Sequence, residues 1–124
     1  ICPTRKRIKD IQRLLKSIID TAKDPQDIEV IFVIDDDDQE SLEYIDSVNI
    51  ETSVVIKKVE VERSKFIFSD LANQALPYCE ADLLLAIGDD GVFRSNHWDV
   101  EVINDFNCVK DKIMLHISGP SCVA

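Results

Sequence analysis

Four stretches of the chain show the spacing and the boundary residues of helices. Over residues 8–22, apolar side chains recur at three- and four-residue steps, which predicts an amphipathic helix. A later helix is expected to start at Ser69 or Asp70 and to be closed by Pro77. The four predicted helices cover residues 8–22, 39–48, 69–76 and 98–106.

Apolar runs rich in β-branched residues alternate with these helices. Residues 28–34 show little polar alternation, as expected of a parallel strand covered on both faces. Residues 83–87, Leu-Leu-Leu-Ala-Ile, read as the clearest buried strand, and shorter strands are expected at residues 54–56 and 113–115. The alternation predicts an α/β fold with a mostly parallel sheet, in a single domain over residues 1–124.

Composition is that of an ordinary globular domain, with 45% hydrophobic and 31% charged residues. The 24 acidic and 14 basic side chains give a net charge of -10, which repels a phosphate backbone, so no nucleic-acid partner is expected. No apolar run approaches the length of a membrane span. The four cysteines stand far apart and are expected to be reduced thiols in an intracellular, cytoplasmic protein.

Two carboxylates, Asp89 and Asp90, follow the strand predicted at residues 83–87. Ligands of open parallel sheets bind beyond the carboxyl ends of the strands. A pair of carboxylates there suits Mg²⁺ or Mn²⁺, which proteins hold with one or two carboxylates plus substrate phosphates. The alternative interpretation is a polar turn that only ends a strand.

Four consecutive aspartates, Asp35 to Asp38, follow the strand predicted at residues 28–34. Either Asp38 alone or Asp37 with Glu40 can cap the next helix. Because adjacent carboxylates repel one another, at least one of the four is expected to bind a ligand. That ligand could be a metal, another cation, or the hydroxyl and base-edge donors of a nucleoside.

Basic residues gather near the start of the chain, in the segment Thr4-Arg5-Lys6-Arg7. This segment follows the expected first strand, where a helix N-terminus and basic side chains favour an anion, unless the charges are simply solvated. Arg63 lies in a polar loop after the strand at residues 54–56. The chain has no Ser/His/Asp set, P-loop or GxGxxG pattern to support a hydrolase, a P-loop protein or a dinucleotide enzyme.

In their order and spacing, four segments resemble the donor-binding half of glycosyltransferase family two, over about residues 1–105. They are Pro3-Thr4-Arg5-Lys6-Arg7, Val33-Ile34-Asp35-Asp36-Asp37-Asp38, Ser69-Asp70-Leu71-Ala72-Asn73-Gln74-Ala75 and Leu84-Leu85-Ala86-Ile87-Gly88-Asp89-Asp90. The resemblance implies a three-layer GT-A fold, which is a Rossmann-like domain that binds nucleotide diphospho-sugars.

The same resemblance implies the residues of the site. Asp90 would be the main ligand of Mn²⁺ or Mg²⁺ at the place of the family's DxD motif, where Gly88 replaces the first aspartate, and Asp89 would be a metal or ribose partner. Residues implied to bind the nucleotide sugar are Pro3, Thr4, Arg5, Asp35, Asp36, Arg63 and Asp89.

The implied activity is transfer of a hexose from a nucleoside diphosphate sugar, taken to be a UDP-sugar, to a hydroxyl of an acceptor that the sequence leaves open. Asp99 is the one candidate for the catalytic base. In the family the acceptor region and the base usually come later than Ala124. The chain is therefore expected to be either a fragment or a module that binds a donor without transferring the sugar. A response-regulator-like domain is a further alternative, although Lys57 and Lys58 stand where it needs an aspartate.

Overall fold

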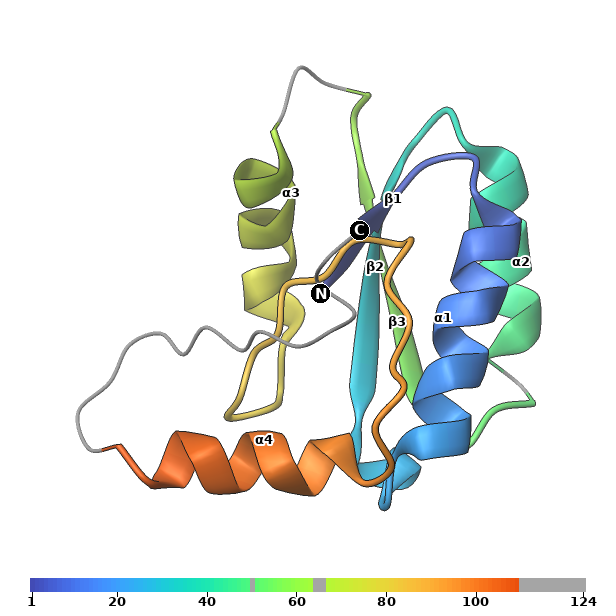
Figure 1. Ribbon diagram of the computed structural model, residues 1–124. Coiled ribbons are helices and arrows are strands. Elements are labelled where there is room, and N and C mark those ends of the chain that lie inside the picture. Colours follow the sequence, from blue (N-terminus) through green and yellow to red (C-terminus); the bar gives the residue numbers. More distant parts are fainter. Residues whose placement is uncertain (50, 64–66, 110–124) are drawn as a thin grey trace.

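A parallel sheet lies between two layers of helices. The computed structural model describes residues 1–49, 51–63 and 67–109. Helices α1 and α2 cover one face of the sheet, α3 covers the other, and α4 lies across one end (Figure 1). The elements are β1 (Cys2–Thr4), α1 (Ile8–Thr21), the 3-10 turn η1 (Pro25–Asp27), β2 (Glu29–Asp35), α2 (Gln39–Val48), β3 (Val55–Val61), α3 (Phe68–Ala75), the 3-10 turn η2 (Leu76–Tyr78) and α4 (Trp98–Asn107).

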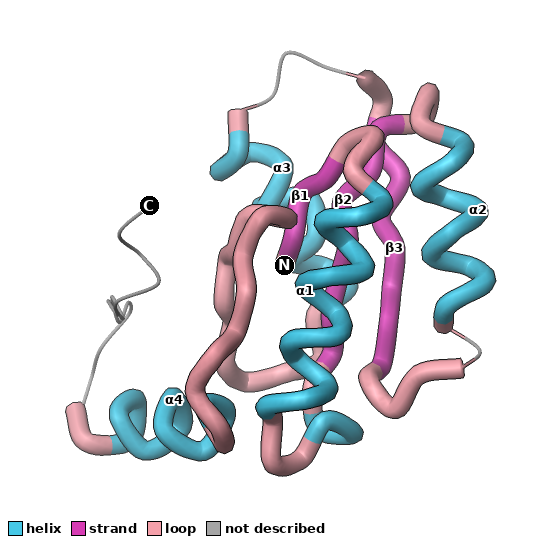
Figure 2. Tube along the Cα trace, turned by 45° about the vertical axis from the view of Figure 1, so that its right-hand side comes forward, coloured by secondary structure: helices cyan, strands magenta, loops and turns pink. Residues whose placement is uncertain are grey.

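The sheet has three strands in the order β1-β2-β3, and both pairings are parallel. Thr4 at the end of β1 pairs with Ile34, and Asp35 at the end of β2 pairs with Val61 at the end of β3. The three strands therefore end at one edge, and the loops that follow them lie together there (Figure 2). This confirms the predicted α/β class, the parallel sheet and the three layers.

Side chains of β2 alternate between two cores. Phe32 is fully buried in the core that α1 and α2 form with the sheet, whereas Ile31 and Val33 lie in a smaller core beneath α3. Burial on both faces explains why this strand shows no polar alternation. The larger core contains Cys2, Ile11, Leu14, Leu15, Ile18, Val30, Phe32, Ile34, Leu42, Ile45, Val54 and Ile56, and the smaller contains Ile31, Val33, Val59, Val61 and Ala75.

The predicted helices are confirmed, with small differences at their ends. Helix α2 has the bounds predicted for it, and α3 begins at Phe68 rather than at Ser69 or Asp70, without a side-chain cap. Strand β3 begins at Val55 and is longer than predicted, because it continues through two lysines. The side chains of these lysines form ion pairs, Lys57 with Glu29 and Glu80, and Lys58 with Asp46. The strand predicted at residues 113–115 lies outside the described residues.

The prediction of a buried strand at residues 83–87 is wrong. The segment is irregular, and Leu84 and Leu85 are 52% and 40% exposed. It does run beside the start of β1: the Ile1 ammonium donates to the Leu85 carbonyl at 2.7 Å, and the Ile87 N–H donates to the Ile1 carbonyl at 3.0 Å. Five consecutive apolar residues predicted a strand buried on both faces. In the described part of the chain, however, few side chains pack against this segment.

The segment before α4 is held against the larger core. The rings of Phe93 and Trp98 stack with centroids 3.9 Å apart, and both pack against that core. The Phe93 N–H donates to the Ser17 hydroxyl at 3.0 Å, and the His97 N–H donates to the Thr21 carbonyl at 2.6 Å. Trp98 is thus a partly buried residue that packs against the larger core.

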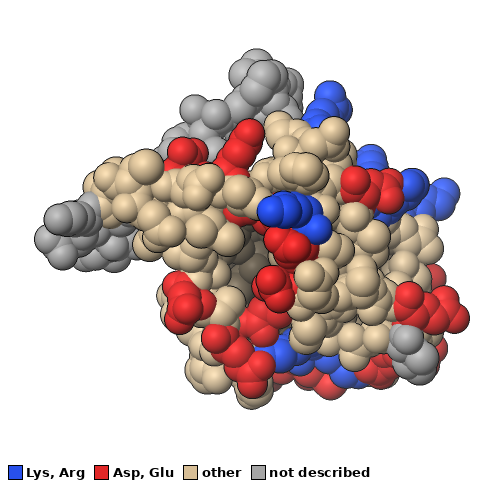
Figure 3. All heavy atoms as spheres, turned by 90° about the horizontal axis from the view of Figure 1, so that it is seen from below, with Lys and Arg blue, Asp and Glu red and all other residues tan. Residues whose placement is uncertain are grey.

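The end of the molecule where α4 lies is mainly uncharged, with scattered acidic side chains and fewer basic ones (Figure 3). Among the described residues, no helix has the length and apolar character needed to cross a membrane.

Replacing Gly91 with alanine is expected to destabilise the fold by about 1–3 kcal/mol, as overpacking does elsewhere. A Cβ at this position would lie 2.6 Å from Cδ1 and 2.9 Å from Cγ1 of Ile87, and 3.1 Å from the Gly88 carbonyl oxygen. Since Ile87 packs against the larger core, its side chain has little room to move. Urea unfolding measures the loss.

Gly88→Ala is the matched control. Its Cβ would meet only the free end of the Asp90 side chain, with Oδ1 at 2.8 Å, and that carboxylate can rotate away. Stability should therefore change by less than about 0.5 kcal/mol. If both variants unfold at the same urea concentration as the wild type, the packing of Ile87 described above is incorrect.

Candidate functional site

A groove of about 480 Å³ opens at the edge where the parallel strands end. We call it the carboxyl-edge groove, and its volume is within the usual range for small-molecule sites. It combines charged groups with an apolar wall from α3. Its lining residues are Pro3, Thr4, Arg5, Arg7, Val33, Asp35, Phe68, Leu71, Gly88, Asp89 and Asp90.

Asp89 is a buried residue that fixes one side of the groove. Its Oδ2 accepts a hydrogen bond of 2.7 Å from the Thr4 hydroxyl, and its Oδ1 pairs with the Arg7 guanidinium at 3.1 Å. These contacts tie the turn after residue 88 to the end of β1 and the start of α1. Both carboxylate oxygens of Asp89 therefore already have a protein partner.

Asp90 differs from its neighbour in both exposure and partners. Its side chain is exposed at the groove, and no hydrogen bond or ion pair joins it to any other described residue. A Cβ added at Gly88 would lie only 2.8 Å from Asp90 Oδ1, so the glycine leaves room for this carboxylate. Asp90 is thus the carboxylate of the groove that is free to bind a ligand.

On the opposite side of the groove, the Arg5 guanidinium lies between two aspartates. Its Nη1 donates to Asp35 Oδ2 at 2.8 Å and also to Asp37 Oδ1, and its Nη2 donates to Asp37 Oδ2 at 3.0 Å. Asp37 also pairs with the Arg63 guanidinium at 3.4 Å. We refer to Arg5, Asp35, Asp37 and Arg63 as the arginine–aspartate cluster; it joins the loops that follow all three strands.

The other two aspartates of the run hold the backbone of these loops. Asp36 Oδ1 accepts the Arg63 N–H at 3.1 Å. Asp38 is 2% exposed and caps α2, because its Oδ1 accepts the Ser41 N–H at 3.3 Å. Its Oδ2 accepts the Lys6 N–H at 2.6 Å, which supports the left-handed backbone of that residue (φ 52°). Of the two caps that the sequence left open, Asp38 alone is the one found, and not Asp37 with Glu40.

The pKa values of these groups follow from their partners. Hydrogen bonds from Arg5 hold the pKa of Asp37 below its usual range, and the same contacts raise the pKa of Arg5. Burial acts to raise the pKa of Asp38, but the hydrogen bonds from Ser41 and Lys6 outweigh burial and lower it. Burial raises the pKa of the Cys2 thiol to about 12, so this cysteine is a neutral core residue.

The predicted site residues fall into three groups. Pro3, Thr4, Arg5, Asp35, Asp89 and Asp90 all line the carboxyl-edge groove. Asp36 and Arg63 lie at the same edge of the sheet but bind each other and Asp37 rather than lining the groove. As expected, Asp36 and Asp90 both lie at the carboxyl ends of the strands.

Asp99, the candidate for the catalytic base, lies apart from the others at the opposite end of the sheet. In the first turn of α4, it accepts N–H groups of Lys23 at 2.9 Å and Asp24 at 3.0 Å, just after α1. Burial acts to raise the pKa of Asp99, but these backbone hydrogen bonds outweigh burial and lower it. Asp99 therefore anchors α4 and does not face the groove.

Sequence reasoning missed two features of this edge. Asp37 could not be separated from its three identical neighbours, because nothing in the sequence shows which aspartate faces Arg5. Phe68, which is 46% exposed, and Leu71 form the apolar wall. Leu71 was indicated only by its position in the helix predicted over residues 69–76, and Phe68 lies just before the start predicted for that helix.

Comparisons with protein-family models, curated proteins and solved structures find no match to this chain.

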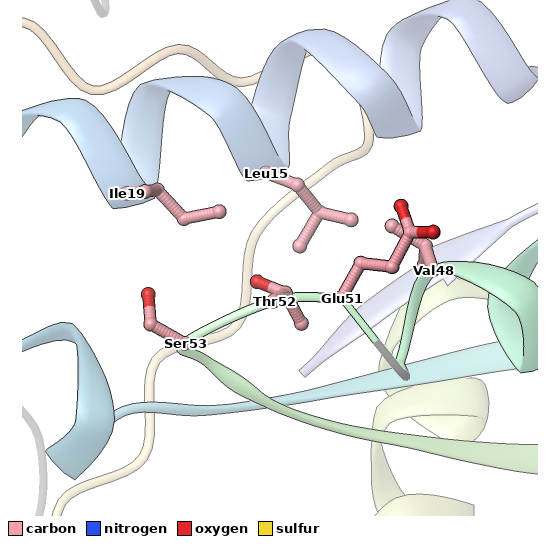
Figure 4. A pocket seen from close by; sticks show the side chains of 6 residues that line it. All are labelled: Leu15, Ile19, Val48, Glu51, Thr52 and Ser53. Atoms are coloured by element: carbon pink, nitrogen blue, oxygen red, sulfur yellow. The ribbon is translucent and has the colours of Figure 1, made fainter.

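A second hollow, of about 380 Å³, lies away from these groups, between α1 and the segment after α2. Leu15 and Ile19 of α1 point toward Val48 and Thr52 (Figure 4). Of the described residues that line it, Glu51 alone is ionisable. With no set of converging polar groups, this hollow offers little chemistry beyond apolar contact.

Chemically, the carboxyl-edge groove offers one free carboxylate, a fixed guanidinium group and an apolar wall. Among the described residues, no group of three or more His, Cys, Asp or Glu side chains is arranged to hold a metal by itself. A cation bound at Asp90 would therefore share its coordination with oxygen atoms of a ligand and with water.

Asp38→Ala is expected to lower the free energy of unfolding by about 2 kcal/mol at pH 7, since it removes a helix cap and the acceptor of the Lys6 N–H. The folded-state pKa of Asp38 lies below that of the unfolded chain, about 3.9. Its stabilisation is therefore present above about pH 3.9 and is lost as the pH falls through the folded-state pKa. Urea unfolding of both proteins at several pH values tests this.

The control is Asp36→Ala, which removes an exposed aspartate of the same run with a single hydrogen bond, from the Arg63 N–H, and should cost less, about 0.5–1 kcal/mol. A difference between the wild type and Asp38→Ala that stays constant into strong acid would contradict the assigned role of the Asp38 carboxylate.

Proposed function

We propose that this chain binds a nucleoside diphosphate sugar together with Mn²⁺ or Mg²⁺ in the carboxyl-edge groove, as a GT-A type domain of a glycosyltransferase. The donor is proposed to be a UDP-sugar and the second substrate an acceptor hydroxyl. The single observation that supports this most directly is Asp90, an exposed carboxylate without a described partner, at the edge of a parallel sheet.

The position of the groove supports a nucleotide ligand. In open α/β sheets, ligands bind beyond the carboxyl ends of the strands, and this groove lies there. Charged side chains on both sides and the apolar wall of Phe68 and Leu71 suit a ligand with a polar and a flat part. Each of the four sequence segments that resemble glycosyltransferase family two contributes to the lining of the groove, for example with Arg5, Asp35, Leu71 and Asp90.

A divalent cation fits Asp90 by its chemistry, because magnesium and manganese prefer carboxylate oxygens. Asp89 fits less well, since both of its oxygens already accept hydrogen bonds from Thr4 and Arg7. We therefore assign Asp90 as the protein ligand and Asp89 as the residue that holds the turn in place. When bound, the cation would supply charge neutralisation for the leaving diphosphate.

A module that binds the donor without transferring the sugar is the second candidate. It is favoured by the position of Asp99, which binds backbone N–H groups of Lys23 and Asp24 far from the groove. Of the three carboxylates that line the groove among the described residues, Asp35 and Asp89 are paired with arginines and Asp90 is assigned to the cation, so none is left to act as the base. Hydrolysis of a UDP-sugar, measured by UDP release, separates an active transferase from a binding module.

A response-regulator-like domain is less consistent with the structure. That class needs an acidic pair after its first strand, but here β1 is followed by Arg5 and Lys6. An intracellular location also belongs to the proposal, and the free thiols of Cys2, Cys79 and Cys108 support it.

UDP is expected to bind more tightly with Mn²⁺ than without it, and Asp90→Ala should abolish this difference. Because Asp90 has no described partner, its truncation should leave the melting temperature in metal-free buffer almost unchanged. Titration calorimetry with UDP, with and without Mn²⁺, measures the binding, and circular dichroism measures the melting.

Asp89→Ala is the paired variant, which removes the neighbouring carboxylate. Unlike Asp90→Ala, it is expected to lower the stability of the fold. It should cost about 1–3 kcal/mol of stability, since the buried Thr4 hydroxyl and Arg7 lose their acceptor. If UDP binds equally well with and without Mn²⁺ in the wild type, the proposed function is wrong. If Asp90→Ala melts several degrees lower yet binds normally, Asp90 is only a turn residue.

A further inference from the structure

Arg5 is the arginine of the carboxyl-edge groove that has two carboxylate partners. Three hydrogen bonds join its guanidinium to Asp35 and Asp37, and the contact with Asp37 is bidentate. Paired forks of this kind fix the plane of an arginine as well as its position. Asp35 lines the groove, whereas Asp37 contacts Arg5 without being part of the lining.

This pairing determines the charge that a ligand meets. Two adjacent carboxylates compensate the single positive charge of Arg5, and the second guanidinium of the cluster, that of Arg63, also points to Asp37. A diphosphate entering the groove would therefore find little net positive charge on Arg5. Attraction of phosphate by arginine depends on such charge, so Arg5 is poorly suited as a phosphate counter-ion.

The guanidinium nevertheless keeps hydrogen-bonding capacity. Arginine has five N–H donors, and three contacts are made to aspartates, which leaves donors and the flat face for a ligand. Neutral acceptors such as the carbonyl oxygens of a nucleobase or the hydroxyls of a ribose match a donor whose charge is already compensated.

We propose that Asp37 is a positioning residue that makes Arg5 a fixed recognition edge for the uncharged nucleoside part of the ligand rather than a counter-ion for its phosphates. The inference rests on the proposed function, because it assumes that a nucleotide occupies the groove. According to this inference, Asp37 contributes to the ligand specificity of the carboxyl-edge groove although it does not line the groove.

The test compares two halves of the ligand, uridine and magnesium pyrophosphate, on the wild type and on Asp37→Asn. Releasing Arg5 from its bidentate partner should weaken uridine binding on the order of tenfold, as expected for the loss of one well-placed hydrogen bond to a charged group. Pyrophosphate binding should stay the same or become tighter, because the arginine–aspartate cluster loses one negative charge and becomes net positive. Both affinities are measured by NMR titration of the folded protein.

Asp46→Asn is the matched control. It removes the same charge from an exposed ion pair with Lys58 that has no contact with the groove, so it should alter neither affinity. A general loss of structure would weaken both ligands together, which the ratio of the two affinities distinguishes from the proposed effect. If Asp37→Asn does not fold, Arg5→Lys decides instead: it keeps the charge without the fork, and it should lose uridine but retain pyrophosphate.

The outcomes separate this inference from the proposed function. A wild type that binds neither uridine nor UDP with Mn²⁺ overturns both. A wild type that binds UDP, together with an Asp37→Asn variant whose ratio of uridine to pyrophosphate affinity is unchanged, overturns the role of Asp37 alone. The same ratio change in Asp46→Asn would also overturn it, because the effect would then come from net charge.

Discussion

Repulsion among four adjacent aspartates is the constraint on which the carboxyl edge of this sheet depends. Consecutive carboxylates destabilise one another unless each has a partner of its own. Here Asp35 and Asp37 share Arg5, Asp36 accepts the N–H of Arg63, and Asp38 accepts N–H groups from Lys6 and from the start of α2. The partners come from the loops after β1 and β3 as well as from α2. The acidic run thus holds together the loops from which the groove is built.

This arrangement divides structural from functional carboxylates within the same short sequence patterns. Asp38 and Asp89 are buried and accept hydrogen bonds at both oxygens, Asp38 from backbone N–H groups and Asp89 from the side chains of Thr4 and Arg7, so their first role is structural. Asp90 is exposed and has no described partner, so it has no comparable structural role. Such a site has fixed structural carboxylates and one free carboxylate, Asp90. It is suited to a negatively charged ligand that coordinates the same cation as Asp90.

Much of the fold followed from hydrophobic spacing, because α1, α2 and β2 bury a regular set of side chains. The strand predicted at residues 83–87 is absent, because a run of apolar residues is compatible with burial but does not specify which other segments would pack against it. For the site, the strand ends placed Thr4 and Asp35 at one edge, since parallel strands end together. Asp90 reaches this edge from an irregular segment, which the contacts of Asp89 with Thr4 and Arg7 hold in place. The choice among four aspartates and the distance of Asp99 from the groove depend on contacts between distant segments, which one sequence does not specify.

The central claim is that a divalent cation and a nucleotide meet at Asp90, and the paramagnetism of Mn²⁺ locates the cation directly. In NMR spectra of the ¹⁵N-labelled protein with UDP, substoichiometric Mn²⁺ should broaden the amide signals of Gly88, Asp90 and Thr4 first. The signals of residues 51–53, at the other end of the sheet, should stay sharp. Broadening that is strongest away from the carboxyl-edge groove, or that is the same with and without UDP, would contradict the account.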